Sequence, residues 1–324
     1  MTVVVVTWNG AHLLRPCLES LAAQTIPHRV LVVDNASTDE TPQLLARFPT
    51  VDVVRLDRNT GFAGGAQAGL DRVSTEFVAF LNNDATAEPG WLAALLAPFD
   101  GDPTMAATTS RILLAADGRI NNAGGAMTRW GAGYDRGYGE PDGPPYDSPV
   151  DVGFFCGGAC ALRVDAARAV GGFPVDYFLY YEDTDLSWRL GLTGQRIRYA
   201  PDAVVHHLHS ASSDQKSASF AFHNQRNQLL TVLRNAPLLL ALASVGRFLL
   251  ITAARVVRPG NGTGTGTGSG SGSGQPGEHS QRPRHRLRVL GSVLRQLPAT
   301  WAARRRIGRA ATLPRRAFAA KWLG

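Results

Sequence analysis

The first part of the chain alternates between short apolar runs and segments of helical periodicity, and this alternation constrains the fold more than any other feature. Residues 2–7 read Thr-Val-Val-Val-Val-Thr, a β-branched run typical of a strand buried on both faces of a parallel sheet. Three more apolar runs follow at residues 30–33, 51–56 and 77–81. Strands and helices that alternate at this spacing predict a doubly wound, mostly parallel α/β sheet with right-handed crossovers.

A sheet of this kind can also bind a nicotinamide dinucleotide, so that class of enzyme needs a separate test. The dinucleotide fingerprint places Gly-x-Gly-x-x-Gly directly after the first strand. Here the first turn is Thr7-Trp8-Asn9-Gly10, and the Gly-rich segment 59–65 follows the third apolar run with a different spacing. The sequence therefore argues against a nicotinamide-dependent dehydrogenase.

Polar side chains follow the predicted strands at the edge where open α/β sheets bind their ligands. Asn9 follows the first strand, and Asp34 with Asn35 follows the second. Asp34 suits a ribose hydroxyl or a pyrimidine N–H. The fourth strand runs into Asn82-Asn83-Asp84, whose oxygens suit Mg²⁺ or Mn²⁺. The same residue types are common in turns and as helix caps, so their positions alone leave both interpretations open.

Two later stretches carry further candidate chemistry. Residues 180–185 read Tyr-Tyr-Glu-Asp-Thr-Asp and place three acids at a helix start among aromatic side chains. Such a carboxylate has a raised pKa that suits a general base, although acids at a helix start also complement its dipole. Residues 206–209 read His-His-Leu-His at a strand end. Three histidines in four positions favour metal or phosphate binding, and ordinary core or surface histidines are the alternative. Gly157-Gly158 allows close backbone approach or marks a bulge, and residues 121–151 predict a long irregular loop.

The composition is that of a globular protein, with an uneven distribution of charge. The 324 residues are 44% hydrophobic and 18% charged, and the formal net charge is +7. The segment from Arg282 onward holds twelve Lys or Arg and no acid, which leaves the rest mildly acidic. Such a tail implies an anionic partner, either nucleic acid or a membrane surface. The three cysteines lack the number and spacing of a disulfide framework or a zinc site and predict buried thiols.

Taken in order, these motifs resemble the family 2 glycosyltransferases of the GT-A fold, in particular the bacterial rhamnosyltransferase-like branch. The resemblance covers residues 2–237 and implies a Rossmann-like nucleotide-diphospho-sugar transferase domain at 1–235. Within it, 1–110 would bind the nucleotide sugar and 111–235 the acceptor. The motifs are Val-Thr-Trp-Asn, Val-Asp-Asn-Ala-Ser-Thr-Asp, Asn-Thr-Gly-Phe-Ala-Gly-Gly, Leu-Asn-Asn-Asp, Gly-Gly-Phe, Tyr-Glu-Asp-Thr-Asp-Leu, a histidine and Arg-Asn.

The resemblance implies roles for the acidic residues and the histidines. Asp183 would be the catalytic base, and Asp84 with His207 would bind Mg²⁺ or Mn²⁺. The family's metal-binding Asp-x-Asp motif is here Asn82-Asn83-Asp84, so a single carboxylate would hold the ion weakly and depend on the donor diphosphate. His206 and His209 are the alternatives to His207.

The resemblance also implies which residues surround the two substrates. The acceptor would be bound by Glu182, Asp185 and Trp188. The donor would be bound by Thr7, Asn9, Asp34, Asn35, Asn59, Gly61, Gly64, Asn82, Asn83 and Arg226, of which Arg226 would contact phosphate.

The activity implied is an inverting, metal-assisted single displacement in cell-wall or surface polysaccharide synthesis. The donor would be dTDP-rhamnose, with UDP-linked galactofuranose, N-acetylglucosamine or glucose as alternatives. The acceptor would be a hydroxyl of a glycan or of a polyprenyl-diphosphate-linked sugar. The single carboxylate of the metal motif keeps a different class open, namely a catalytically silent relative that binds a sugar nucleotide or a membrane.

The C-terminal third predicts attachment to a membrane surface. Residues 236–259 form an apolar stretch that Arg247 interrupts, which favours an interfacial helix over a spanning one, with a helix packed on the domain as the alternative. Residues 260–281 predict a flexible Gly/Ser/Thr linker that separates the tail from the domain. Residues 282–324 predict a basic amphipathic helix that binds anionic lipids rather than nucleic acid. The expected location is cytoplasmic and peripheral, on the inner face of the membrane.

Overall fold

The protein is built on a mixed ten-stranded sheet, as seen in a computed structural model that describes residues 1–208, 217–257 and 282–322. The first four strands run parallel: β1 (Thr2–Thr7), β2 (Arg29–Asp34), β3 (Asp52–Arg55) and β4 (Phe77–Leu81). β11 (Ala159–Arg163) runs antiparallel between β4 and β6 (Met105–Leu114), and β12 (Arg196–His207) lies parallel to β6. The order is β10-β12-β6-β11-β4-β1-β2-β3, with β5 (Ala85–Ala87) on β12, β7 (Ile120–Asn122) on β6 and β10 (Val150–Asp151) at the edge.

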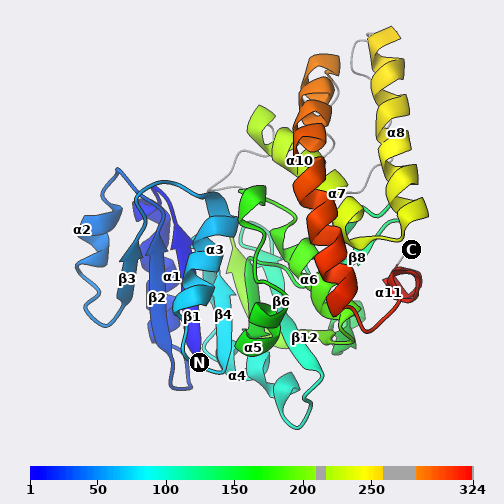
Figure 1. The fold of residues 1–324 in the computed structure, drawn as a ribbon. Helices are drawn as coiled ribbons and strands as arrows, with labels where there is room; N and C mark the ends of the chain where they lie inside the picture. Colours follow the sequence, from blue (N-terminus) through cyan, green and yellow to red (C-terminus); the bar gives the residue numbers. More distant parts are fainter. Residues whose placement is uncertain (209–216, 258–281, 323–324) are drawn as a thin grey trace.

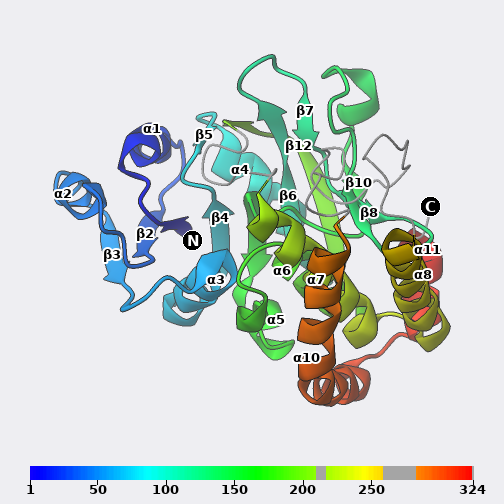
Figure 2. The same ribbon diagram turned by 90° about the horizontal axis from the view of Figure 1, so that it is seen from above.

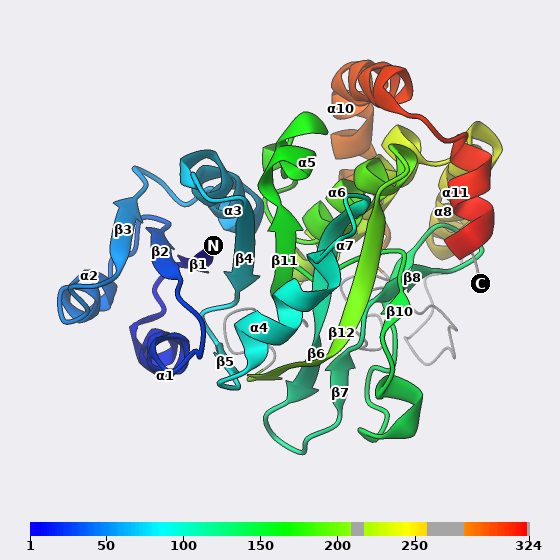
Figure 3. The ribbon, with the colours of Figure 1, turned by 90° about the horizontal axis from the view of Figure 1, so that it is seen from below.

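Helices cover both faces of this sheet, because its strands are apolar on both sides (Figures 2 and 3). One face packs on α1 (Ala11–Ala22), α2 (Thr41–Leu45) and α4 (Trp91–Leu96), where Val3 and Val5 meet Leu14 and Trp91. The other face packs on α3 (Gly61–Arg72), α5 (Val164–Ala169) and α6 (Glu182–Leu192), where Val4 and Phe80 meet Leu70 and Leu186. The predicted α/β architecture with helices on both faces of a central sheet is confirmed, and β1 to β4 are parallel as expected, whereas β5, β7, β10 and β11 pair antiparallel and make the sheet mixed.

Two segments differ from what the sequence predicts. The Gly-rich segment 59–65 is not separate from the helix that follows, because α3 already starts at Gly61. Its glycines let the helix lie close to the sheet, because a Cβ on Gly65 would come within 2.5 Å of Val6. The irregular loop after residue 121 contains a hairpin of β8 (Gly125–Met127) and β9 (Gly133–Asp135).

The C-terminal helices pack on the domain instead of standing apart from it. α7 (Ala218–Asn235) lies on α6, α10 (Pro283–Ala310) lies along α7, and α11 (Arg315–Trp322) contacts α6. Val293 of α10 is buried with Tyr177 and Leu229, and Phe318 of α11 is buried with Trp188. The predicted separation of the tail is therefore wrong, and the linker proposed for residues 260–281 lies outside the described residues.

α8 (Leu238–Val257) and α10 rise side by side beyond the end of the sheet (Figure 1). They rise at the end where β1 finishes, which is the edge that carries the polar side chains. Arg286 of α10 ties the two helices together, since its Nε donates to Oγ1 of Thr252 at 2.9 Å and its guanidinium lies 3.9 Å from the ring of Phe248. Among the described residues, α8 is the one helix long and apolar enough to cross a membrane by length and composition.

Candidate active site

The carboxyl ends of β1 and β2 hold a buried acid and its partners. Asp34 ends β2, is 1% exposed and accepts from the backbone N–H of Ser37 at 2.9 Å. Its other oxygen pairs with Arg55 of β3 at 2.9 Å, and the same guanidinium donates to the Ser37 carbonyl. The half-exposed Arg55 thus places a cation beside the acid predicted to bind the nucleoside.

The other residues predicted to bind the donor shape this edge through bonds within the protein. Asn35 donates to the Gly61 carbonyl at 2.9 Å and accepts from the N–H of Thr60, which fixes the start of α3 against β2. Thr7 accepts from Asn83 at 2.9 Å inside the protein. The remaining contacts are internal as well: Asn9 accepts from the N–H of Thr38, Asn59 accepts from the N–H of Gly61, and a Cβ on Gly64 would overlap Thr60.

Asp84, in the turn after β4, and His207, at the end of β12, come together although they are far apart in the sequence. Nε2 of His207 lies 3.1 Å from Oδ1 of Asp84 and 3.4 Å from Nδ2 of Asn82. Nδ1 of His207 lies 2.7 Å from Oδ1 of Asn121, an oxygen that can only accept. This contact puts a ring hydrogen on Nδ1 and turns Nε2 toward the carboxylate of Asp84.

A divalent ion fits this pair of atoms. Two neighbouring ligands on an octahedral ion with bonds of about 2.1 Å lie about 3.0 Å apart, close to the 3.1 Å between Nε2 of His207 and Oδ1 of Asp84. Within the described residues, however, no group of three His, Cys, Asp or Glu side chains could hold a metal. The protein thus offers an imidazole, one carboxylate and the amide of Asn82, a set that leaves most of the coordination to other ligands.

The other two candidate histidines are placed differently. His206 precedes His207 on β12 and so points to the opposite face, where its Nε2 lies 3.2 Å from Oε1 of Glu88. It does not approach Asp84. His209 lies outside the described residues.

Gly157 and Gly158 separate the Asp84–His207 pair from the acidic start of α6. The N–H of Gly157 donates to Oδ2 of Asp183 at 3.0 Å. The carbonyl of Gly158 accepts from the N–H of Asn82 at 2.8 Å, and a Cβ on Gly158 would come within 3.2 Å of the Asn82 amide. This glycine pair therefore contacts the candidate base on one side and the Asn82 end of the metal motif on the other.

Asp183 and Glu182 lie at the first turn of α6 in an apolar setting. Burial raises the pKa of the Asp183 carboxyl, while the N–H groups of Gly157 and Thr184 act in the opposite direction. Burial also raises the pKa of Glu182, and the neighbouring Asp183 adds to that effect. Oε2 of Glu182 has no hydrogen-bond partner, which suits a protonated side chain or one that meets a ligand.

The segment just before Glu182 has an unusual backbone. Phe178, Tyr180 and Tyr181 have φ of 67°, 67° and 68°, a region that costs a bulky residue of order 1–3 kcal/mol each. Phe178 centres a γ-turn of the rare positive-φ form, closed by a bond of 2.8 Å from the N–H of Leu179 to the carbonyl of Tyr177. The carbonyl of Phe178 accepts from the N–H of Ala63, so this strained segment rests on the start of α3.

Three predicted site residues have their side chains turned into the protein. Asp185 is 1% exposed and binds Arg189 and Asn235, and Trp188 is fully buried against Phe154 and Phe318. Arg226 is buried as well and donates to the carbonyls of Asp176 and Tyr177. Direct acceptor contacts by Asp185 and Trp188, and phosphate contact by Arg226, do not fit this structure, because Asp185 binds Arg189 and Asn235, Trp188 packs on α11, and Arg226 binds backbone carbonyls.

Sequence reasoning missed three residues that shape this edge: Arg55, Asn121 and Asn227. Arg55 lies on the outer strand β3, where it is directly in register with Asp34. That pairing follows from strand order and register, which no local pattern reveals. Asn121 reaches His207 from the segment predicted as an irregular loop. Asn227 stands beside Arg226 in the Arg-Asn motif, which was the one signal that could have found it.

Comparison with known proteins matches this chain to enzymes named as glycosyltransferases. The pre-mycofactocin glycosyltransferase of Mycobacterium tuberculosis is 33% identical over 225 residues, which are 69% of this chain and 46% of that protein. This chain therefore corresponds to about half of that relative. The N-acetylglucosaminyl-diphospho-decaprenol L-rhamnosyltransferase of the same organism is 29% identical over 256 residues, covering 69% of this chain and 81% of that protein.

Solved structures share the fold at low sequence identity. S. aureus TarS 1-349 in complex with UDP-GlcNAc matches with a TM-score of 0.55 at 18% identity, over 99% of this chain and 88% of that one. GalNAc-T7 with UDP, GalNAc and Mn²⁺ matches with a TM-score of 0.54 at 19% identity, over 64% of this chain and 42% of that one. These likenesses show the GT-A fold. The family model for glycosyl transferase family 2 matches residues 2–171, more than half of the chain, and the chain therefore belongs to the family 2 glycosyltransferases.

Proposed function

We propose that this enzyme transfers a sugar with inversion from a nucleotide-diphosphate donor to an acceptor hydroxyl, with Asp183 as the base. The observation that supports the proposal is the arrangement at the sheet edge, where the adjacent Gly157 and Gly158 contact the Asp183 carboxylate and Asn82, beside Asp84 and His207. One base facing one site for the leaving group is the arrangement that a single displacement needs. Inversion follows from that geometry.

Asp84 and His207 would hold a divalent ion, with Asn82 beside them. When bound, Mg²⁺ or Mn²⁺ neutralises the charge that develops on the leaving diphosphate. Asn121 keeps the hydrogen of His207 on Nδ1 and so leaves Nε2 ready to coordinate. Because the protein contributes one charge, much of the affinity for the ion would come from the donor.

Asp183 would accept the proton of the acceptor hydroxyl as the new bond forms. Its raised pKa makes it a stronger base than an exposed aspartate, and the N–H of Gly157 holds Oδ2 in a fixed direction. Glu182 stands beside it with an oxygen that no protein group contacts, and it would meet a hydroxyl of the acceptor sugar. Asp34 would bind the nucleoside, with Asn9, Asn35 and Arg55 beside it.

Asp183→Asn tests the assignment of the base. It should abolish transfer while donor affinity, measured by calorimetry, stays unchanged. The matched control is Asp165→Asn, an exposed acid in the first turn of α5 whose carboxylate also binds an N–H of its own helix. Wild-type turnover by Asp183→Asn would exclude Asp183 as the base.

The donor we propose is dTDP-rhamnose, supported by relatives named as rhamnosyltransferases in M. tuberculosis and in Salmonella typhimurium. UDP-linked galactofuranose, N-acetylglucosamine and glucose are the alternatives, and TarS was solved with UDP-GlcNAc. A thermal-shift screen of nucleotide sugars with Mn²⁺ decides among them, since only a donor that binds the folded state raises the melting temperature. The acceptor would be a glycan or a polyprenyl-diphosphate-linked sugar, as the decaprenol in one relative's name suggests.

A second candidate is a catalytically silent sugar-nucleotide-binding protein, favoured by the single carboxylate in the metal motif. The two candidates differ in donor hydrolysis with Mg²⁺ or Mn²⁺. The enzyme should release nucleoside diphosphate slowly without acceptor and lose this activity in Asp84→Ala. A protein that binds the donor and never hydrolyses or transfers it would be the silent relative.

We also propose that α8 and α10 hold the enzyme on the cytoplasmic face of an anionic membrane. α8 exposes a row of leucines and valines, and α10 exposes Leu294 at 63% and Trp301 at 48% between its arginines. Neither helix contains an acid. Exposed apolar side chains next to basic ones fit a bilayer with acidic lipids. The exposed residues of α8 are Leu238, Leu239, Leu242, Leu249, Leu250, Val256 and Val257.

Sedimentation with lipid vesicles tests this attachment. The wild type should pellet with vesicles that contain phosphatidylglycerol and less with purely zwitterionic ones. The pair Leu239→Glu and Leu250→Glu should abolish pelleting. Val53→Glu, an equally simple change at an exposed valine on β3, should not. Binding that persists in the double variant would refute the surface, and binding to DNA instead would favour a nucleic-acid partner.

A further inference from the structure

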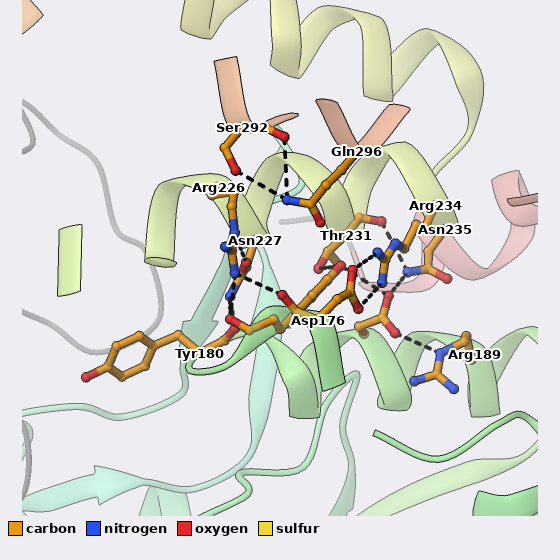
Figure 4. Close-up of polar contacts among 12 residues, drawn as sticks. Asp176, Tyr180, Arg189, Arg226, Asn227, Thr231, Arg234, Asn235, Ser292 and Gln296 are labelled. Carbon is orange, nitrogen blue, oxygen red and sulfur yellow. Dashed lines mark hydrogen bonds and ion pairs between the residues drawn. The ribbon is translucent and has the colours of Figure 1, made fainter. Parts of the chain in front are cut away.

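α7 turns a polar face toward the strained segment before the proposed base, and the chemistry above gives this face no role. Asn227 lies in this face and is fully buried. Its Nδ2 donates to the backbone oxygens of Tyr177 and Leu179 at 3.1 and 2.7 Å. It also donates to the backbone oxygen of Tyr180 at 2.7 Å (Figure 4). A single side-chain amide with two hydrogens thus binds three carbonyls within four consecutive residues.

Arg226 fixes the orientation of this amide. Its Nε donates to Oδ1 of Asn227 at 2.8 Å, so the nitrogen of Asn227 must face the three carbonyls (Figure 4). Its terminal nitrogen donates to the carbonyls of Tyr177 at 2.6 Å and Asp176 at 3.2 Å. One turn and two turns further along the helix, Thr231 contacts the Tyr177 hydroxyl and Arg234 pairs with the Asp176 carboxylate.

The segment held in this way would not keep its shape by itself. Three aromatic residues in the left-handed region favour a return to negative φ, because their Cβ atoms crowd the backbone. The bonds from Asn227 fall on the carbonyls of Leu179 and Tyr180 and on the residue before Phe178, which are the peptide groups that would rotate. Tyr181 is the last such residue, and α6 starts directly after it at Glu182.

We propose that Asn227 is a positioning residue that holds the Tyr177–Tyr181 backbone in its left-handed form and thereby directs Asp183 at the acceptor hydroxyl. This inference rests on the proposed function, since it takes Asp183 as the base. It also explains why Arg226 is turned inward: it supports the Asn227 amide. Asn227 acts through the backbone and touches neither substrate.

Asn227→Leu removes the donors while keeping a side chain of similar size. We expect kcat to fall about 100-fold, the usual cost of misplacing a reacting group by about 1 Å, while the donor KM stays unchanged. Asn235→Leu is the matched control. It is an equally buried asparagine on the same helix, and its amide binds the Asp185 side chain and the Thr231 carbonyl instead. It should lose a similar amount of thermal stability and keep its kcat.

Hydrogen exchange gives a readout that does not need activity. Asn227→Leu should speed exchange of the amides from Leu179 to Thr184, and Asn235→Leu should not. If the wild type transfers no sugar, the proposed function fails, and the exchange experiment still decides whether Asn227 holds the segment. Where Asn227→Leu does not fold, Arg226→Gln is the second variant, with the same signs expected for kcat and exchange. Unchanged exchange, or equal losses of kcat in the Asn227 and Asn235 variants, would overturn the proposal.

Discussion

Replacing Asp185 by alanine separates a structural carboxylate from one that binds the acceptor. Its side chain is 2% exposed and that of its partner Arg189 is 7% exposed, with 2.8 Å between Oδ2 and Nε. Asn235 donates to the other oxygen at 2.7 Å. Removing one partner of a buried ion pair costs about 3–5 kcal/mol. At about 2 °C per kcal/mol for a domain of this size, the melting temperature should fall by roughly 6–10 °C.

The assay combines thermal melts with acceptor kinetics at a temperature where every variant is folded. The control is Glu19→Ala, which breaks the ion pair to Arg15 at the same i,i+4 spacing on α1 but at 46% and 59% exposure. It should change stability by at most about 0.5 kcal/mol. Asp185→Ala should leave the acceptor KM unchanged. A raised acceptor KM with an unchanged melting temperature would refute the structural role and restore the acceptor contact predicted from the sequence.

Three further outcomes are expected. Activity should rise with pH as Asp183 loses its proton, and a pH–rate profile checks this. The pKa values of the Asp183 and Glu182 carboxyls are raised in the folded state, so both groups stabilise the fold at low pH and lose that contribution as the pH rises through the raised pKa values. Urea melts of the wild type and of Glu182→Gln against pH check this second trend. Asn121→Ala should weaken the apparent Mn²⁺ affinity about 10–100-fold in donor hydrolysis while His206→Ala leaves it unchanged; equal effects would contradict the assignment of His207. Gly61 has a φ of +71°, and a Cβ there would lie 2.1 Å from the Phe178 carbonyl oxygen, so Gly61→Ala should lower the melting temperature. Gly90→Ala should not, because a Cβ at Gly90 would meet open space.

The strands and their polar ends could be predicted from the sequence because both are local properties. β1 and β4 have the predicted bounds, and a polar residue that follows a buried parallel strand must lie at the carboxyl edge. Asp34 and Asp84 were identified in this way. Their partners Arg55 and His207 come from other strands, so the pairing depended on the order and register of the sheet.

The acidic start of α6 could be predicted only in part. Asp183 and Asp185 are two residues apart, which on an α-helix turns them about 200° from each other, so they cannot serve the same face. The sequence shows that one must face inward but not which one. The structure decides it through Arg189 and Asn235, which bind Asp185 inside the protein. Trp188 follows a cluster of acids in the sequence, a pattern that suggested a sugar-binding side chain. In the structure, however, Phe318 of α11 packs on Trp188 and covers it.

The two halves of the site depend on different amounts of the chain. Asp34 and Asn35 lie at the end of β2 and are held by contacts within the first part of the domain, whereas Asp84 follows β4 and also contacts His207 of β12. Asp183 depends on a strained segment that α7 holds from about fifty residues further along, and α7 is itself packed against Val289 and Val293 of α10. One face of the basic tail therefore completes the cluster that supports the proposed base, while its other face exposes Leu294 and Trp301. Damage to α10 should accordingly weaken catalysis before it weakens donor binding, because Asp34 and Asn35 are held by contacts in the other half of the domain.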